Sequence, residues 1–349
     1  MSRNVLHLST FLNATAKHGG YKRSLQLAEI AQADGIRTLC IPSGLYELLS
    51  VLFRSPLSAF AILPIAVTIG MRSLSLKGVA ATILYGGWLH AQMRRHGWPR
   101  VMLEVSANQG VIMGNVLVSF NVRFSAYPHN IEFMVPGQNQ SFFRSEGAAF
   151  AAEMLVYRAA CRVHAISELD AAVLRAMNVE LVQTLLYSPP KSEQSALYQI
   201  RKLRVTSDKT GILILGTAWN PPTRLGLEGL LDLIRECSSG QTFTLAGFGT
   251  EVLAPIAPSS VRVLGGVSDA MIRDLMVQAE ALLVCQPPTS GMLTRLVEAS
   301  FAGIPTYVLG GYFQARGMDN QGVHSISSLD ELFKAMPEHL GAEEPARPA

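Results

Sequence analysis

The chain is poor in charged residues and in cysteine. Only 16% of its 349 residues are Asp, Glu, Lys or Arg, whereas 49% are hydrophobic, and the mean hydropathy is +0.25. A net charge of +3, with no basic run that alternates with aromatic residues, argues against nucleic-acid binding. So apolar a composition instead suggests a surface that faces a membrane or a protein partner.

The cysteines exclude a disulfide framework. They are far apart and form no Cys-x-x-Cys pair, so we expect four reduced thiols in the core: Cys40, Cys161, Cys237 and Cys285. The N-terminus enters an apolar run at once, without the charged start, long apolar stretch and cleavage site of a signal peptide. We therefore expect a cytoplasmic protein.

The length and the order of the patterns predict two α/β domains. A chain of 349 residues exceeds the size at which one core stays efficient. Short β-rich runs alternate with helical patterns, which is typical of parallel sheets covered by helices. A stretch rich in proline and polar residues at 187–194 fits an interdomain linker. We predict domains at 1–190 and 191–340, with a disordered tail at 341–349.

The predicted strands fall into two series. The first series occupies 5–9, 38–42, 101–105, 124–127 and 163–166, with helices after Gly20, Ser145 and Ser167. The second series occupies 211–215, 242–246, 261–264, 281–284 and 306–309, with helices at 225–236, 269–278 and 292–302. Ser167 is expected to cap its helix, with Asp170 as the acidic partner three residues on. Glu168 is a possible residue of the crevice.

One segment of the first domain, near 48–103, departs from the α/β pattern. It contains no acidic residue and six cations: Arg54, Arg72, Lys77, Arg94, Arg95 and Arg100. Its two uncharged stretches, 55–71 and 78–93, are shorter than the roughly 20 residues that span a bilayer. One interpretation is an interfacial surface for anionic lipid headgroups, with the protein peripheral at the inner face of the membrane. The other interpretation is a set of core helices with solvated basic ends.

The most informative motif lies at 281–305. A buried strand leads into a loop rich in Pro, Gly and Ser, then into a helix that ends at Gly303-Ile304-Pro305. A helix N-terminus at the carboxyl edge of a parallel sheet binds phosphate, because its N–H groups and the positive end of its dipole point at the ligand. Gly291 would permit close approach, and Arg295, one turn into the helix, would add a bidentate contact. Glu298 would accept hydrogen bonds from ribose hydroxyls; the alternative is a surface ion pair with Arg295.

At these residues the chain resembles the retaining glycosyltransferases of family 4 and their GT-B relatives. Their C-terminal domains carry a Gly/Ser-rich loop, a basic residue and then Glu-Ala-x-x-x-Gly-x-Pro, which matches 298–305. Three more family-like pieces occur in the expected order: Ile214-Leu215-Gly216-Thr217, Leu245-Ala246-Gly247-Phe248-Gly249 and Val263-Leu264-Gly265-Gly266-Val267-Ser268-Asp269. The last two look like the loops that frame the nucleotide, which implies donor-binding roles for Gly247 and Val267. The resemblance implies the GT-B fold, in which two Rossmann-like domains have parallel sheets that face a central crevice.

One position departs from the family pattern. The family commonly has a second glutamate, with seven residues between the two, that touches the sugar ring; here Ser290 stands at that position. Ser290-Gly291 with Arg295 looks closer to relatives that have a Gly-Ser-Gly-type loop and a downstream basic residue. Arg224, after the turn-like stretch Asn220-Pro221-Pro222-Thr223, is the candidate for the family's other phosphate-contacting cation. The alternative for Arg224 is a solvated side chain without a ligand.

Two motifs in the first half occur where the resemblance expects them. Gly19 and Gly20 follow the first strand, so their backbone is a candidate contact for the diphosphate or the acceptor; the alternative is an ordinary turn. The stretch Pro128-His129-Asn130-Ile131-Glu132 places an imidazole, an amide and a carboxylate at a strand end. The resemblance implies that His129 lies beside the transferred sugar, and we assign Asn130 and Glu132 to the acceptor side. The alternative is a histidine whose hydrogen bonds are satisfied in a loop.

The resemblance implies a glycosyltransferase of hexosyltransferase type, with His129 and Glu298 as catalytic residues. It would move a sugar from a nucleotide-diphospho-sugar to a glycan or lipid-linked acceptor, with retention of configuration and without a cofactor or metal. The sequence has no tight Asp-x-Asp motif of the kind that holds a metal beside a diphosphate. Two alternatives stay open: a nucleotide-sugar epimerase of the same architecture, and a catalytically degenerate subunit that docks a membrane partner.

Overall fold

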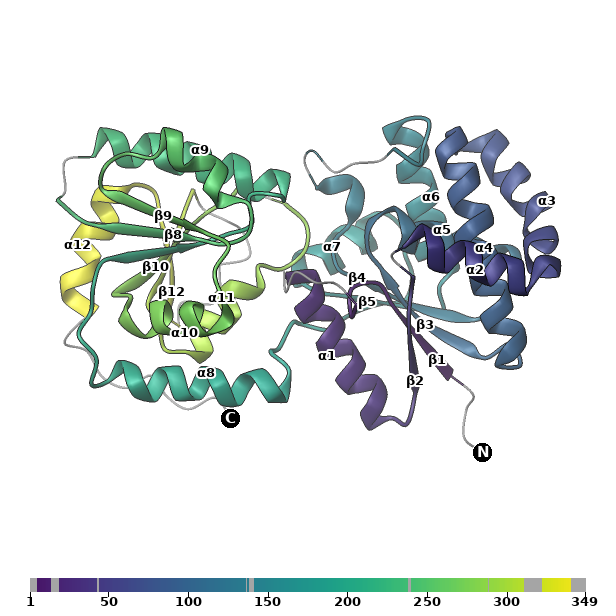
Figure 1. Ribbon diagram of the computed structural model, residues 1–349, viewed down its shortest axis with the longest axis horizontal. Helices are drawn as coiled ribbons and strands as arrows, with labels where there is room; N and C mark the ends of the chain where they lie inside the picture. The colour runs from purple at the N-terminus through teal and green to yellow at the C-terminus, as the bar shows by residue number, and fades with distance from the viewer. Residues whose placement is uncertain are drawn as a thin grey trace. The chain divides into compact units, whose positions relative to one another are not determined.

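The computed structural model describes residues 5–13, 19–42, 44–135, 137, 141–237, 240–287, 289–310 and 322–339. The chain divides into two compact units. The first comprises residues 1–187 together with 290–292, and the second comprises 188–289 and 293–349. Each unit is a parallel sheet covered by helices (Figure 1). The predicted tail at 341–349 lies outside the described residues.

The first unit is built on six described strands in the order β2-β1-β3-β4-β5-β6, all parallel. The strands are β1 (Val5–Ser9), β2 (Arg37–Cys40), β3 (Arg100–Val105), β4 (Phe124–Pro128), β5 (Arg162–Ala165) and β6 (Val182–Thr184). The helices are α1 (Gly19–Ala33), α2 (Leu45–Arg54), α3 (Pro56–Arg72), α4 (Leu76–Arg95), α5 (Ala107–Ser119), α6 (Glu146–Ala159) and α7 (Glu168–Ala176), with a 3-10 turn η1 (Glu132–Met134). Figure 1 shows α1 on one face of the sheet and α4 and α5 on the other. Strand β3 is mostly apolar because both faces of the sheet are covered.

The order of the strands reverses between β1 and β3. Strand β2 lies on one side of β1, and β3 lies on the other side. In open α/β sheets, ligands bind beyond the carboxyl ends of the strands at such a switch point. The ends of β1 and β3 therefore mark the place where the first unit is expected to carry a site.

Between β2 and β3 the chain adds a layer of three helices. Helices α3 and α4 form a packed hairpin, and α4 also packs on α5. Gly86 permits this close approach, since a Cβ at that position would lie 3.0 Å from Ile62 and 3.2 Å from Val116. Pro56 begins α3, and Pro64 lies inside it. Within the described ranges, no helix combines the length and the apolar character needed to cross a membrane.

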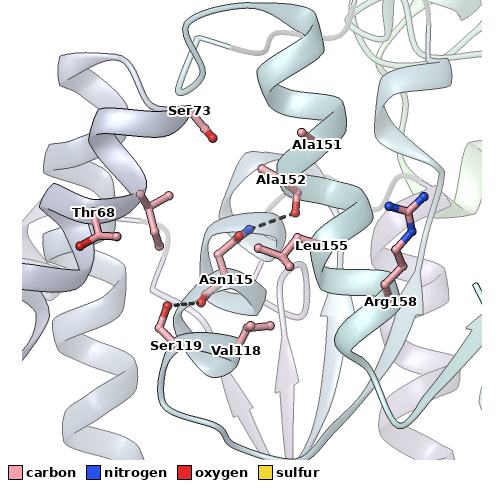
Figure 2. A pocket seen from close by; sticks show the side chains of 10 residues that line it. Thr68, Ser73, Asn115, Val118, Ser119, Ala151, Ala152, Leu155 and Arg158 are labelled. Atoms are coloured by element: carbon pink, nitrogen blue, oxygen red, sulfur yellow. Dashed lines mark hydrogen bonds between the residues drawn. The ribbon is translucent and has the colours of Figure 1, made fainter.

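A cavity of about 490 Å³ lies among α3, α5 and α6 (Figure 2). Its polar lining groups donate hydrogen bonds to helix carbonyls: Thr68 Oγ1 to Pro64 O, Asn115 Nδ2 to Val111 O and Ala152 O, and Ser119 Oγ to Asn115 O. The rest of the lining is mainly apolar, with Arg158 at one side. The lining therefore mixes apolar side chains with polar groups, several of which already donate hydrogen bonds.

The second unit repeats this plan with six described parallel strands in the order β12-β11-β10-β7-β8-β9. The strands are β7 (Ile212–Leu215), β8 (Phe243–Ala246), β9 (Val261–Gly265), β10 (Ala281–Cys285), β11 (Thr306–Leu309) and β12 (Val323–Ile326). The helices are α8 (Lys191–Arg204), α9 (Pro221–Glu236), α10 (Asp269–Gln278), α11 (Thr294–Phe301) and α12 (Leu329–His339), with a 3-10 segment η2 (Thr250–Ile256). Here the switch point lies between β7 and β10.

Each strand predicted from the sequence is present, with ends that differ by at most two residues. Strands β6 and β12 escaped prediction because each is short and β12 mixes polar with apolar residues. The expected cap is confirmed, since Ser167 Oγ accepts a hydrogen bond from Asp170 N at 3.1 Å.

Two expectations were wrong. Helix α11 begins at Thr294 rather than 292, so Arg295 is its second residue instead of standing one turn in. The four cysteines are free thiols, but none is buried, and Cys161 is exposed just before β5.

Candidate functional site

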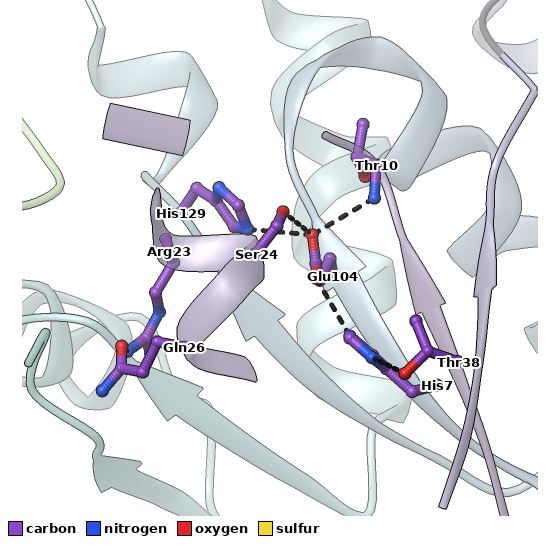
Figure 3. Close-up of polar contacts among 8 residues, drawn as sticks. All are labelled: His7, Thr10, Arg23, Ser24, Gln26, Thr38, Glu104 and His129. Atoms are coloured by element: carbon purple, nitrogen blue, oxygen red, sulfur yellow. Dashed lines mark hydrogen bonds and ion pairs between the residues drawn. The ribbon is translucent and has the colours of Figure 1, made fainter. Parts of the chain in front are cut away.

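Glu104 is the centre of a buried polar network in the first unit (Figure 3). Its fully buried carboxylate lies 2.9 Å from His7 Nε2 and accepts a hydrogen bond from Thr10 N at 3.2 Å. Ser24 Oγ donates to it at 2.5 Å, and His129 Nε2 lies 3.2 Å away. Strand β1, helix α1, strand β3 and the segment after β4 thus direct their side chains to one carboxylate at the switch point.

The surroundings of Glu104 keep it ionised. Burial alone would raise the pKa of Glu104, but its interactions with His129 and His7 outweigh burial and hold that pKa below its usual range. His7 is fixed on its other side by Thr38 Oγ1, 3.0 Å from Nδ1. Glu104 is therefore a buried anion at neutral pH whose field orients two imidazoles.

His129 is buried, with 5% of its surface exposed. Its ring lies between Glu104 and Phe11, whose ring centroid is 5.5 Å away. Nε2 is at ion-pair distance from Glu104 but outside hydrogen-bond geometry, and Nδ1 has no hydrogen-bond partner among the residues that the structure describes. A buried polar atom without a partner costs free energy. A bound ligand would therefore supply the hydrogen-bond partner that His129 Nδ1 lacks.

Arg23 is a second buried group with unused donors. It lies on α1 with 1% of its surface exposed, and Nη1 donates to Gln26 Oε1 at 2.5 Å. Within the described ranges, Nε and Nη2 have no hydrogen-bond partner. Burial lowers the pKa of Arg23 to about 10, against the opposing charge of Glu104. Gly19 and Gly20 form the first turn of the same helix.

Ser290 and Gly291 are held by residues of the first unit. Ser290 Oγ donates to Asp170 Oδ1 at 2.9 Å and accepts from Ile131 N, while Gly291 N donates to Asp170 Oδ2 at 3.0 Å. Gly291 has a φ of +90°, and a Cβ there would collide with Asn130 Oδ1, so the position requires glycine. The N–H group of Gly291 that the sequence offered to a phosphate is therefore engaged by a carboxylate.

Glu132 lies beside a second buried carboxylate. Its backbone N–H donates to Glu153 Oε1 at 2.8 Å, and Tyr157 OH donates to the same oxygen at 2.8 Å. Burial and then the charge of Glu132 raise the pKa of Glu153 to about 7. Glu153 is therefore a buried carboxyl group with a pKa near neutrality beside the charge of Glu132.

The second unit has a network of different chemistry at its own switch point. Gln286 follows β10, and its Oε1 accepts from Thr223 Oγ1 at 2.9 Å and from Arg295 Nη2 at 2.9 Å. Thr223 in turn accepts from Asn220 Nδ2 at 2.9 Å. The loop after β10 and the helices α9 and α11 thus meet beyond the ends of β7 and β10. The network fixes a cationic side chain at the start of α11.

The remaining candidates of the second unit lie on the same helices and strand ends. Glu298 is on α11 with 7% of its surface exposed. The alternative of an ion pair at the protein surface was therefore wrong, because Glu298 is buried. Gly247 follows β8 with a φ of +141°, and a Cβ there would collide with Gly216 O. Val267 is half-buried before α10. Arg224 Nε donates to Glu228 at 2.8 Å, and its side chain is more than half exposed.

Sequence reasoning missed Glu104, His7, Ser24, Thr223, Gln286 and the contact of Asp170 with Gly291. One signal was present: Glu104 is an acidic residue inside a mostly apolar strand, where an unpaired charge would be costly. Gln286 likewise follows a buried strand directly. Among the described residues, no three His, Cys, Asp or Glu side chains are grouped to hold a metal ion.

No protein-family profile and no curated protein matches the chain. Solved structures do. Sucrose-phosphate synthase from Thermosynechococcus elongatus aligns over 96% of this chain and 89% of its own, with a TM-score of 0.64 and 12% identity. HepE of Anabaena in complex with UDP aligns over 97% and 90%, with a TM-score of 0.55 and 13% identity.

A third similar structure is the UDP-GlcNAc 2-epimerase of Methanocaldococcus jannaschii in complex with UDP-GlcNAc and UDP. It aligns over 97% of this chain and 93% of its own, with a TM-score of 0.52 and 12% identity. At such identities the likeness concerns the fold alone. It shows that this chain has the two-domain α/β architecture of these proteins, the GT-B fold.

Proposed function

We propose that the protein is a glycosyltransferase that moves a sugar from a nucleotide-diphospho-sugar to a glycan or lipid-linked acceptor. The observation that carries the proposal is the network of Thr223, Gln286 and Arg295 at the switch point of the second sheet. It fixes a guanidinium beside a helix N-terminus, and both features attract a diphosphate. HepE, one of the similar structures, is in complex with UDP, which supports the choice of ligand class.

Glu298 would bind the nucleoside part of the donor. It is a buried carboxylate one turn after Arg295 on the same face of α11. Gly247, at the end of β8, would let the backbone approach the ligand closely. Arg224 is exposed, so it would have to exchange Glu228 for the diphosphate. These residues, with Val267, form our proposed donor set.

His129 would contact the transferred sugar or the acceptor. Its buried Nδ1, which has no partner among the described residues, would hydrogen-bond to a sugar hydroxyl. Glu104 would act as a positioning residue, because its charge holds the imidazole from the Nε2 side. Asn130 and Glu132, which follow the same strand, are assigned to the acceptor side.

Charge that develops on the leaving diphosphate would be stabilised by Arg295, Arg224 and the dipole of α11. These cations would do the work that a metal ion does in other transferases, so we propose a metal-independent reaction. Retention of configuration is part of the proposal through the resemblance to family 4. Ser290, where that family commonly has a glutamate, would leave sugar contacts to other groups, since its hydroxyl already donates to Asp170.

An epimerase is the second candidate. Two carboxyl groups, Glu132 and Glu153, and the imidazoles beside Glu104 supply acid and base groups in the first unit. A catalytically degenerate subunit would bind nucleotide without turnover. Incubation of a nucleotide-sugar with and without an acceptor panel, with products identified by mass spectrometry, separates the three: transfer only with acceptor, an epimer without acceptor, or no product.

The donor site is tested by a thermal-shift screen of nucleoside diphosphates and their sugars, since a ligand of the folded state raises its stability. For the best ligand, Glu298→Ala should weaken binding in calorimetry by about 1–3 kcal/mol, because a buried hydrogen-bonding group is lost. Glu236→Ala, at the exposed end of α9, is the matched control and should bind as the wild type does. Equal affinity of Glu298→Ala and the wild type would remove Glu298 from the site.

A further inference from the structure

The outward sides of α2 and α3 form one exposed apolar face. We name it the outer face; it consists of Tyr46, Leu49, Phe53, Leu57, Phe60, Leu63, Val67 and Met71. Spacings of three and four residues place the members of each helix on one side of it. Phe53 is 84% exposed and Met71 is 74% exposed, so these are not the margins of buried side chains. Figure 1 shows α3 at the outer edge of the first unit.

The opposite side of α3 is buried and consists of small or apolar residues. Ser58, Ile62, Ala66 and Gly70 recur every four residues and are buried. Residues 55–71 contain no charged side chain. A helix that is apolar all round is normally buried on every side. Contiguous apolar surface of this kind marks a surface that binds another molecule.

The margin of the outer face is cationic. Arg54 at the end of α2 and Lys77 at the start of α4 are both exposed. Arg144 is also exposed, and its guanidinium donates to Leu74 O at 2.7 Å, at the turn between α3 and α4. No acidic residue occurs in 48–103, and Glu47 stands at the start of α2. An apolar face with a positive margin complements a surface that is apolar within and anionic at its rim.

The cavity among α3, α5 and α6 adds to the apolar surface of the same helix. Thr68 of α3 and Ser73, which directly follows α3, border it on one side, and α6 borders it on the other (Figure 2). Three of its polar side chains, Thr68, Asn115 and Ser119, already donate hydrogen bonds to helix carbonyls.

We propose that the outer face seats the protein on an anionic lipid bilayer, with α2 and α3 lying in the plane of the interface. Helix α3 has 17 residues and so a length of about 25 Å, too short to span but sufficient to lie along the headgroup region. A second copy of the chain is a poorer occupant, because pairing of two outer faces would bring two cationic margins together. The proposal is independent of the proposed function, since lipid binding needs no nucleotide.

Vesicle flotation of the full chain tests the proposal. We expect the wild type to float with vesicles that contain phosphatidylglycerol and to remain at the bottom with pure phosphatidylcholine. The triple substitution Phe53→Gln, Phe60→Gln, Met71→Gln should lower the floated fraction at least tenfold. Leu203→Gln, Val205→Gln, Leu233→Gln changes three exposed apolar residues of the second unit and should float as the wild type does.

Charge-reversal variants separate electrostatic attraction to the vesicle from insertion into it. Arg54→Glu with Lys77→Glu should reduce flotation on anionic vesicles severalfold, whereas Lys202→Glu with Arg262→Glu, both exposed in the second unit, should not. Trp fluorescence of Phe60→Trp should be quenched by brominated lipid, which adsorption without insertion would not cause. The proposal is overturned if the wild type fails to float, if the Gln variant floats equally, or if light scattering shows that the outer face is closed by a stable dimer.

Discussion

The two units share a sheet plan but differ in the chemistry at the switch point. In the first unit, β1 and β3 direct a buried carboxylate and two imidazoles to one place. In the second unit, β7 and β10 direct a neutral hydroxyl and amide to a guanidinium. The fold therefore determines where a site lies, and the side chains at the strand ends determine what it does. An ionisable network suits proton and hydroxyl chemistry, whereas a fixed cation suits a diphosphate.

The largest effect is expected from removal of the charge in the first network. Glu104→Gln should lower the free energy of unfolding of the first unit by about 3–5 kcal/mol at pH 7, since the buried donors around Glu104 lose their anionic partner. Urea unfolding followed by the fluorescence of Trp88, which is buried in that unit on α4, measures it. The unfolding of the second unit, reported by Trp219, should not change.

The sign of the pH dependence adds a check. Because the pKa of Glu104 is lowered by folding, its stabilisation is present above the unfolded pKa and declines as the pH falls through the acid range. A loss below about 1 kcal/mol at pH 7 in Glu104→Gln would contradict the idea of an anion that organises the network.

Glu153 is a second buried glutamate, and folding shifts its pKa in the direction opposite to that of Glu104. Folding raises its pKa to about 7, so its contribution is fully present below the unfolded pKa near 4.5 and is lost as the pH rises to about 7. The difference in free energy of unfolding between the wild type and Glu153→Gln can be measured by urea unfolding between pH 5 and 8. It should therefore fall as the pH rises and level off above pH 7. A flat difference would show that Glu153 is ionised throughout.

The regular parts of both sheets could be predicted from the sequence. Parallel strands covered on both faces are short apolar runs bounded by turn residues, and such runs as 281–284 and 306–309 are recognisable without tertiary information. The end of β3 was harder. Glu104 lies in an apolar run, and its partners His7, Ser24 and His129 are distant in sequence, so no local pattern connects them.

The loop at Ser290 shows why local motifs mislead. A Ser-Gly pair before a helix is typical of a phosphate site, and sequence alone assigns its N–H groups to a ligand. In the structure Asp170 receives both the Ser290 hydroxyl and the Gly291 N–H, and burial raises the pKa of Asp170 to about 6. The backbone N–H of the same residue does donate to Ser167 Oγ in the predicted helix cap, because capping depends on neighbours within one turn.

The smallest expected effect is on ligand affinity and tests the second network. Gln286→Leu removes the oxygen that accepts from Thr223 and Arg295, so the guanidinium loses the contact that fixes its direction. We expect nucleoside diphosphate to bind about tenfold more weakly in calorimetry, about 1.4 kcal/mol, because one charge-assisted contact is no longer positioned. Gln194→Leu removes a glutamine of α8 that donates to Pro189 O, and it should leave the affinity unchanged. Equal losses in both variants would show that the loss does not depend on the contacts of Gln286, and the proposed diphosphate site at the second switch point would lose its support.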